Sequence, residues 1–126
     1  MHAAALPAPP QSPPEGIRAG IDLFNCGEFH KAHELMERTW RATPGPERVL
    51  YQALIQAAVA FWRLGQGKPA IALMLLHRAL PKLEEFRPTC AGIDVESLYR
   101  AIVVLRDRIS APGARVEHRL PKIHTR

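Results

Sequence analysis

Residues 24–40 read FNCGEFHKAHELMERTW, and this stretch decides the fold. Gly27 is typical of a tight turn, so the stretch predicts the end of one helix and the start of a second. At 3.6 residues per turn, one apolar face of the second helix consists of Phe29, Ala32, Met36 and Trp40. The stretch therefore predicts two antiparallel helices joined by a short turn.

Two polar side chains share that face of the second helix. His33 falls inside the apolar face, and Glu37, one turn later, lies on its border. A histidine and a carboxylate that point toward a core need hydrogen-bond partners. These two residues are therefore the first candidates for a functional site.

Three further helices follow from apolar positions at helical spacing, and no period-2 pattern predicts a sheet. A fourth helix starts near Pro69 and is expected to kink or end early at Pro81, and Asp94 is the expected N-cap of the fifth. The helix after Pro46 is apolar nearly all round, which is typical of the middle of a bundle. The predicted fold class is all-α, with about five helices in stacked antiparallel hairpins. The first three helices are expected at about 15–26, 28–41 and 46–64.

The chain divides into three parts by composition. Residues 1–14 hold five prolines and no charge, which predicts a flexible, extended leader. Residues 15–109 form the predicted single helical domain, with 13 Lys and Arg against 11 Asp and Glu. Residues 110–126 form a basic tail with four Lys and Arg against one Glu, and we expect this tail to be solvated and disordered.

Composition also excludes several classes of protein. No uncharged apolar run is long enough for a membrane span, and the N-terminus has no signal-peptide pattern, so a cytoplasmic address is expected. Cys26 and Cys90 have no CxxC spacing and are expected to be reduced. His30 and Glu34 have metal-ligand spacing with the candidate pair, but in one copy only. No metal ion and no cofactor are predicted.

The motif FNxGxFxxAHExxExxW, followed by LIQAA at residues 54–58, resembles the family catalogued as domain of unknown function 309. These are small, helical, mostly bacterial proteins, and the resemblance covers residues 16–109. It implies a fold of stacked antiparallel hairpins, similar to a short helical repeat, and no established activity. The family pattern carries over onto Ala32, His33, Glu34, Glu37 and Trp40, with Glu37 three residues after Glu34. Many relatives have Gly-Asn after the third helix, where this chain has Gly67-Lys68.

Two interpretations of the candidate site stay open. In the first, His33 and Glu37 meet the polar stripe of the third helix in a pocket, where His33 is a general acid or base and Glu37 orients it. Arg48 and Arg63 at its ends would attract a small anionic ligand. In the second, the same residues cross-tie two helices, and Asn25 caps the turn. The binding residues named by the first interpretation are Asn25, Glu34, Trp40, Arg48, Gln52, Gln56 and Arg63.

Three functions follow from these interpretations. The first is a binding or interaction module, whose partner is another copy of the chain or another protein. The alternative is a small, hydrolase-like enzyme that uses His33 and Glu37. The third is nucleic-acid binding through the basic tail, against which the near-neutral domain and the lack of a basic helix face both argue.

Overall fold

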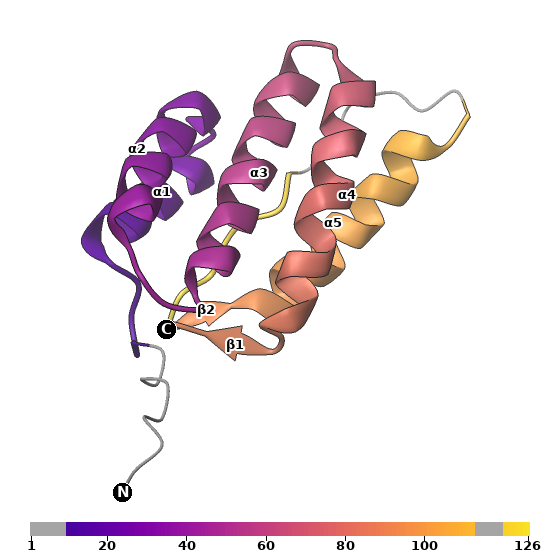
Figure 1. Cartoon of the computed structure of the whole chain (residues 1–126). Coiled ribbons are helices and arrows are strands. Elements are labelled where there is room, and N and C mark those ends of the chain that lie inside the picture. Colours follow the sequence, from indigo (N-terminus) through magenta and orange to yellow (C-terminus); the bar gives the residue numbers. More distant parts are fainter. Residues whose placement is uncertain (1–9, 113–119) are drawn as a thin grey trace, which may run out of the picture.

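The computed structural model describes residues 10–112 and 120–126. This part of the chain is mostly helical and forms one compact domain, as predicted (Figure 1). No helix in it is long and apolar enough to cross a membrane. The elements, in chain order, are α1 (Glu15–Asn25), α2 (Phe29–Ala42), α3 (Arg48–Gly65), α4 (Pro69–Glu85), β1 (Thr89–Cys90), β2 (Ile93–Asp94) and α5 (Val95–Ser110).

Two helix ends use the same turn. Gly27 after α1 and Gly67 after α3 both have positive φ, at 83° and 74°. At each end, the residue after the glycine donates its backbone N–H to a carbonyl group in the last turn of the helix. The Glu28 N–H bonds to the Leu23 C=O at 2.9 Å, and the Lys68 N–H bonds to the Arg63 C=O at 3.0 Å. Glycine is suited to this left-handed position because it has no Cβ. The expected α1–α2 turn is therefore confirmed, and the α3–α4 turn repeats it.

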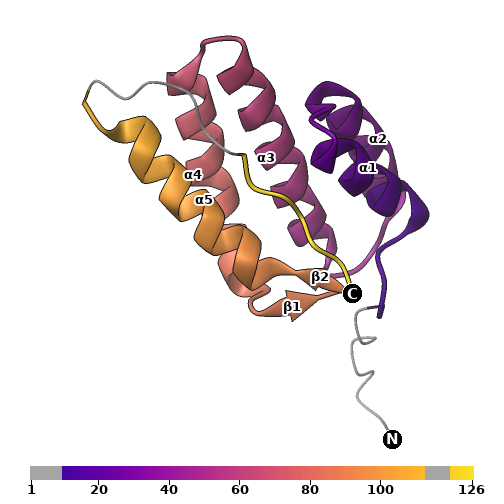
Figure 2. The same cartoon turned by 180° about the vertical axis from the view of Figure 1, so that it is seen from behind.

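The helix α3 lies at the centre of the domain. Figure 1 shows α2, α3 and α4 side by side, with α1 behind α2 and α5 behind α4. Seen from behind, the C-terminal segment crosses α3 between α1 and α5 (Figure 2). This arrangement buries α3 on most sides, as its sequence predicts. The buried residues of α3 are Leu50, Tyr51, Ala53, Leu54, Ile55, Ala57, Ala58, Ala60, Phe61 and Leu64.

Close packing joins α1 to α2. Gly16 and Gly20 lie one turn apart on the face of α1 that meets α2. A Cβ at Gly16 would overlap the Thr39 side chain, and a Cβ at Gly20 would overlap the Met36 side chain. The two glycines therefore allow the backbones of α1 and α2 to approach more closely than any other residue would permit.

The structure contradicts the prediction that no sheet forms, and it excludes one of the two outcomes expected at Pro81, an early end of the fourth helix. The strands β1 and β2 form a two-residue antiparallel hairpin, with positive φ at both turn residues, Ala91 and Gly92. Strands this short show no alternating pattern, so the sequence predicted no sheet. Pro81 lies inside α4, which continues to Glu85 instead of ending at the proline. Burial of Leu83 in the core, two residues after Pro81, favours continuation of the helix.

Both terminal segments are more ordered than expected. Ile123 in the tail is buried and bonded to the domain, so the prediction of a disordered tail was wrong for residues 120–126. In the predicted leader, Pro13 is buried, and the Gln11 carbonyl lies against Gly92. Apolar burial at Ile123 and Pro13 offsets the entropy lost on ordering. Residues 1–9 and 113–119 lie outside the described part of the chain.

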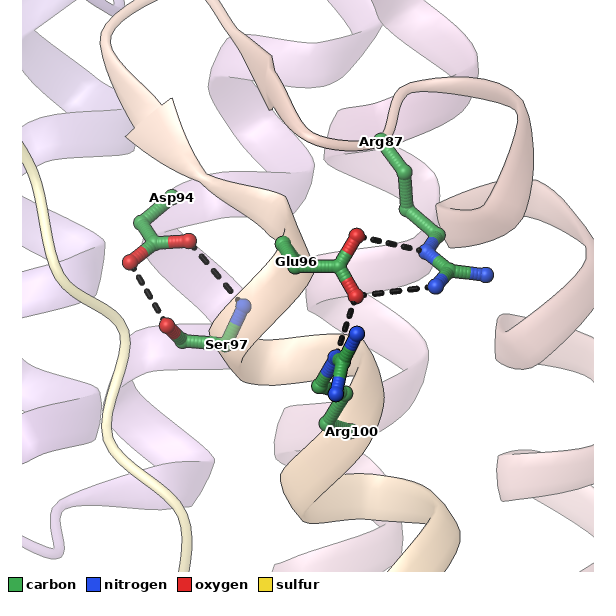
Figure 3. A network of polar contacts seen from close by, with 5 residues as sticks. All are labelled: Arg87, Asp94, Glu96, Ser97 and Arg100. Atoms are coloured by element: carbon green, nitrogen blue, oxygen red, sulfur yellow. Dashed lines mark hydrogen bonds and ion pairs between the residues drawn. The ribbon is translucent and has the colours of Figure 1, made fainter.

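Figure 3 shows how polar contacts fix the hairpin to the start of α5. Asp94 accepts hydrogen bonds from the Ser97 backbone N–H at 3.0 Å and hydroxyl at 2.7 Å, which confirms it as the N-cap. Arg87 makes two bonds to the Glu96 carboxylate, at 3.0 and 2.8 Å, and Arg100 makes a third. These hydrogen bonds lower the pKa of Glu96 to about 2.

We expect Gly20→Ala to lower the free energy of unfolding by about 1–3 kcal/mol, because the added methyl group overlaps Met36. Gly65→Ala is the matched control, since a Cβ there meets nothing within 4 Å and should stabilise α3 by about 0.4–1 kcal/mol. Urea denaturation of both variants measures the difference. Equal effects of the two substitutions would contradict the close approach of α1 and α2.

We expect the contribution of Glu96 to stability to depend on pH. Its pKa falls from 4.5 to about 2 on folding, so the stabilisation is complete above pH 4.5 and is lost as the pH falls toward 2. Urea denaturation of Glu96→Gln should show a deficit at pH 7 that closes over this range. The control is Glu85→Gln, on the exposed end of α4. A deficit that is constant between pH 7 and pH 2 would refute this assignment.

Candidate functional site

The turn between α1 and α2 holds the C-terminal segment by one side chain. Asn25, the last residue of α1, donates from Nδ2 to the Ile123 carbonyl oxygen at 2.8 Å. The Ile123 N–H donates to Asn25 Oδ1, also at 2.8 Å. One amide side chain thus pairs with both backbone polar groups of a single residue, as a neighbouring β-strand would.

A lysine adds a charge at the same point. Lys122 Nζ donates to the Asn25 backbone carbonyl oxygen at 2.6 Å. This carbonyl belongs to the last turn of α1, where unpaired carbonyl groups carry partial negative charge. The ammonium group therefore caps the C-terminal end of α1.

The segment then continues along the edge of β2, with which it forms an isolated antiparallel bridge. The Asp94 N–H donates to the His124 carbonyl oxygen at 2.9 Å, and the Arg126 N–H donates to the Gly92 carbonyl oxygen at 2.8 Å. Ile93 and Thr125 form an antiparallel bridge. The segment covers the edge of β2 that does not pair with β1. Its backbone thus makes hydrogen bonds both with Asn25 at the turn and with the hairpin.

Apolar side chains complete the contact. Ile123 is 1% exposed and is part of the core, while Leu120 packs against the core from its edge. Leu120 and Pro121 also line two open hollows. The larger, of about 580 Å³, adjoins the α1–α2 turn at Phe24 and Phe29, and the smaller, of about 330 Å³, adjoins α5. The segment thus lies between α5 and the turn, which agrees with its path in Figure 2.

The structure corrects the expected role of Asn25. We predicted a cap on nearby backbone groups, but the side chain bonds to Ile123, 98 residues away. Lys122 and Ile123 were missed as site residues, because the tail was interpreted by its charge. The available signal was apolar: Leu120, Pro121 and Ile123 interrupt an otherwise polar segment.

His33 and Glu37 form a contact on the surface of α2. His33 Nε2 lies 2.9 Å from Glu37 Oε2, and the two side chains are 25% and 32% exposed. Arg41 donates to the other Glu37 oxygen at 3.0 Å. The Nδ1 atom of His33 is buried and has no hydrogen-bond partner among the described residues. The pair therefore lies at the border of the interface instead of inside it, and its catalytic role stays a prediction.

The polar stripe of α3 is level with this pair. Contacts of Phe29 with Phe61 and of Trp40 with Arg48 fix α2 and α3 as antiparallel neighbours, so the helical rise sets His33 level with Gln56 and Glu37 level with Gln52. Gln56 Oε1 is also buried without a partner among the described residues. No hydrogen bond joins His33 or Glu37 to Gln52 or Gln56 there. The predicted pocket around four polar residues therefore stays a prediction.

The other predicted site residues have separate local partners. Arg48 lies over the Trp40 ring at 4.2 Å and donates to the Trp40 carbonyl oxygen at 3.2 Å. Arg63, at the other end of α3, lies over Trp62 at 4.5 Å and bonds to Gln66. Glu34 Oε1 lies 2.9 Å from His30 Nδ1. Among residues 10–112 and 120–126, no three His, Cys, Asp or Glu side chains form a group that could hold a metal ion.

Comparison with known proteins confirms the expected resemblance. Residues 17–75 match the family described as "Domain of unknown function (DUF309)". An uncharacterized protein of the bacterium Aquifex aeolicus (strain VF5) is 30% identical over 73 residues, which are 57% of this chain and 22% of that protein. The chain thus matches about a fifth of the length of this relative. The matched region includes Asn25 and His33, whereas β1, β2, α5 and the C-terminal segment lie outside the family match.

We expect Asn25→Ala to release the C-terminal segment. Without the amide, the Ile123 N–H and C=O lose their partners, so exchange of the Ile123 amide hydrogen should accelerate by about 10- to 100-fold. Amide exchange followed by NMR measures this directly. Gln66→Ala, in the equivalent turn after α3, is the control and should leave the Ile123 rate unchanged. Unaltered exchange in Asn25→Ala would show that Asn25 does not hold the segment.

Proposed function

We propose that this protein is a binding module that holds an extended polypeptide segment at the α1–α2 turn and the edge of β2. The observation that supports this proposal is the pair of hydrogen bonds between Asn25 and the backbone of Ile123. The partner is another polypeptide, in agreement with the first function expected from the sequence. The chain's own residues 120–126 then occupy the position of a ligand.

Recognition through the backbone supports binding of a segment. Asn25 offers one donor and one acceptor to a single residue, and the edge of β2 offers further backbone groups. Addition of a strand to a free sheet edge is a common mode of peptide recognition. Main-chain bonds supply affinity in such sites, and pockets for alternate side chains supply specificity.

The scaffold fixes the backbone that carries the Asn25 amide before binding. Asn25 is in the last turn of α1, and the backbone bonds around Gly27 fix the turn that follows. The close approach of α1 and α2 at Gly16 and Gly20 limits movement of the hairpin. A rigid binding group loses little conformational entropy on binding, which favours affinity.

The energetics suit a reversible contact. Burial of Ile123 and part of Leu120 contributes roughly 3–5 kcal/mol, and five hydrogen bonds add about 5 kcal/mol at about 1 kcal/mol each. Ordering seven residues costs roughly 7–10 kcal/mol at about 1–1.5 kcal/mol each. The favourable terms exceed this cost by up to about 3 kcal/mol, so the segment is held in place but can still leave and return.

The two other functions have less support. An enzyme that uses His33 and Glu37 would rely on a partly exposed pair, and Arg41 also contacts Glu37. The ion-pair contacts of His33 and Glu37 within residues 10–112 and 120–126 include no nucleophile. Nucleic-acid binding through the tail would compete with the use of Lys122 at the end of α1. We place the binding module in the cytoplasm, as the sequence predicts.

A peptide selection tests the proposed function. The substitution Ile123→Ser removes the buried anchor of the segment, so the full-length variant, here named the opened chain, should leave the site accessible. We expect peptides selected from a random library on the opened chain to lose at least about tenfold in affinity when Asn25→Ala is added, because they lose two main-chain bonds. Isothermal titration measures the affinities, with Gln66→Ala as the control. The proposed function would be refuted if the selection recovered no peptide whose affinity falls when Asn25→Ala is added.

A further inference from the structure

We propose that the site selects a segment in which a lysine directly precedes a branched aliphatic residue, and that the chain's own tail is its removable internal competitor. The partner is therefore an extended segment of another polypeptide that carries this pair. The inference rests on the proposed function and adds the ligand's chemistry and its regulation. It follows from what surrounds Lys122 and Ile123.

The C-terminal end of α1 favours a positive charge supplied from outside the helix. The last turn of α1 contains no basic residue, although its carbonyl groups carry partial negative charge. Lys122 supplies the charge through its Nζ atom, 2.6 Å from the Asn25 carbonyl oxygen. A compact ammonium group suits a single carbonyl acceptor better than the planar, forked guanidinium group of arginine does. The position before the anchor is therefore selective for lysine.

The next position requires an apolar side chain. Asn25 fixes the backbone of Ile123 on both sides, so the direction of the side chain is set by two bonds of 2.8 Å. That side chain is 1% exposed and belongs to the same buried cluster as Phe24 and Ile93. A polar group there would lose its hydration without gaining a partner. A β-branched aliphatic residue also suits the extended backbone that the bridge to β2 imposes.

The following positions carry little side-chain information. His124, Thr125 and Arg126 are exposed, and their hydrogen bonds to the hairpin are those of the backbone. The charges of His124 and Arg126 add a minor attraction to Asp94, whose pKa they help to lower. Any residue other than proline can supply these N–H and C=O groups. Selectivity is therefore concentrated in the Lys-Ile pair.

The tail competes because it is part of the same chain. A tethered ligand has an effective concentration on the order of millimolar, so it excludes a free segment of equal intrinsic affinity until the free concentration is comparable. The tethered tail and a free segment of the same sequence would make the same contacts with the site. Release of residues 120–126 therefore controls access to Asn25.

The experiment uses a fluorescein-labelled peptide of residues 118–126 and fluorescence anisotropy. We expect it to bind the opened chain, Ile123→Ser, at least tenfold more tightly than the parent chain. Within the peptide, Ile123→Ser should weaken binding by at least about tenfold, and Lys122→Gln by about three- to fivefold. The matched charge control, Arg119→Gln, removes the same charge three residues before Lys122 and should change binding less than twofold. Circular dichroism checks that the opened chain is folded.

Each other outcome is decisive. Equal binding of all four peptides by the folded opened chain would overturn the selectivity and leave the proposed function intact. Equal binding of the peptide by the parent and opened chains would overturn the competition. No binding by the folded opened chain would overturn the proposed function together with the inference. If Ile123→Ser prevents folding, the chain variant Lys122→Gln replaces it, since Lys122 is exposed and its loss should still raise peptide affinity above that of the parent.

Discussion

The need to cover α3 on every side governs this structure. An 18-residue helix with ten buried positions cannot face water on any broad surface, so its neighbours must surround it. The helices α2 and α4 cover two sides, and the paired helices behind them leave a space that the C-terminal segment crosses (Figure 2). An extended segment thus completes a layer in which a further helix would be expected. The proposed binding site follows from this incomplete layer.

The site combines a rigid part and a replaceable part. The rigid part is the α1–α2 hairpin, whose glycine contacts and turn bonds set the position of Asn25. The replaceable part is a short strand held mostly by groups that any polypeptide possesses. A domain stabilised mainly by its helices can lose such a strand without losing its core, because only Ile123 of the segment is deeply buried. The proposed binding would therefore depend on few of the contacts that stabilise the helices.

Local chemistry explains what the sequence predicted well. Gly27 and Asp94 each act through residues within four positions, so their turn and cap could be recognised from spacing alone. The contact between Asn25 and Ile123 spans 98 residues and has no periodic signal. His33 illustrates a finer limit: helical spacing placed it on an apolar face, but a border position and a core position differ by a fraction of a turn. Only the packing of α2 on α3 decides between them.

The repeated turn has a consequence for how such a site arises. Asn25 is the last residue of α1 and lies two residues before Gly27, which has positive φ. Gly65 is the last residue of α3 and lies two residues before Gly67, which also has positive φ. The two hairpins therefore share one turn geometry, and a single side chain distinguishes the turn that holds the C-terminal segment from the one that only reverses the chain. Contact with an extended segment is thus added to the hairpin by one side chain and does not require a different backbone. A protein built from more copies of it could gain or lose peptide contacts one residue at a time, with its helices left as they are.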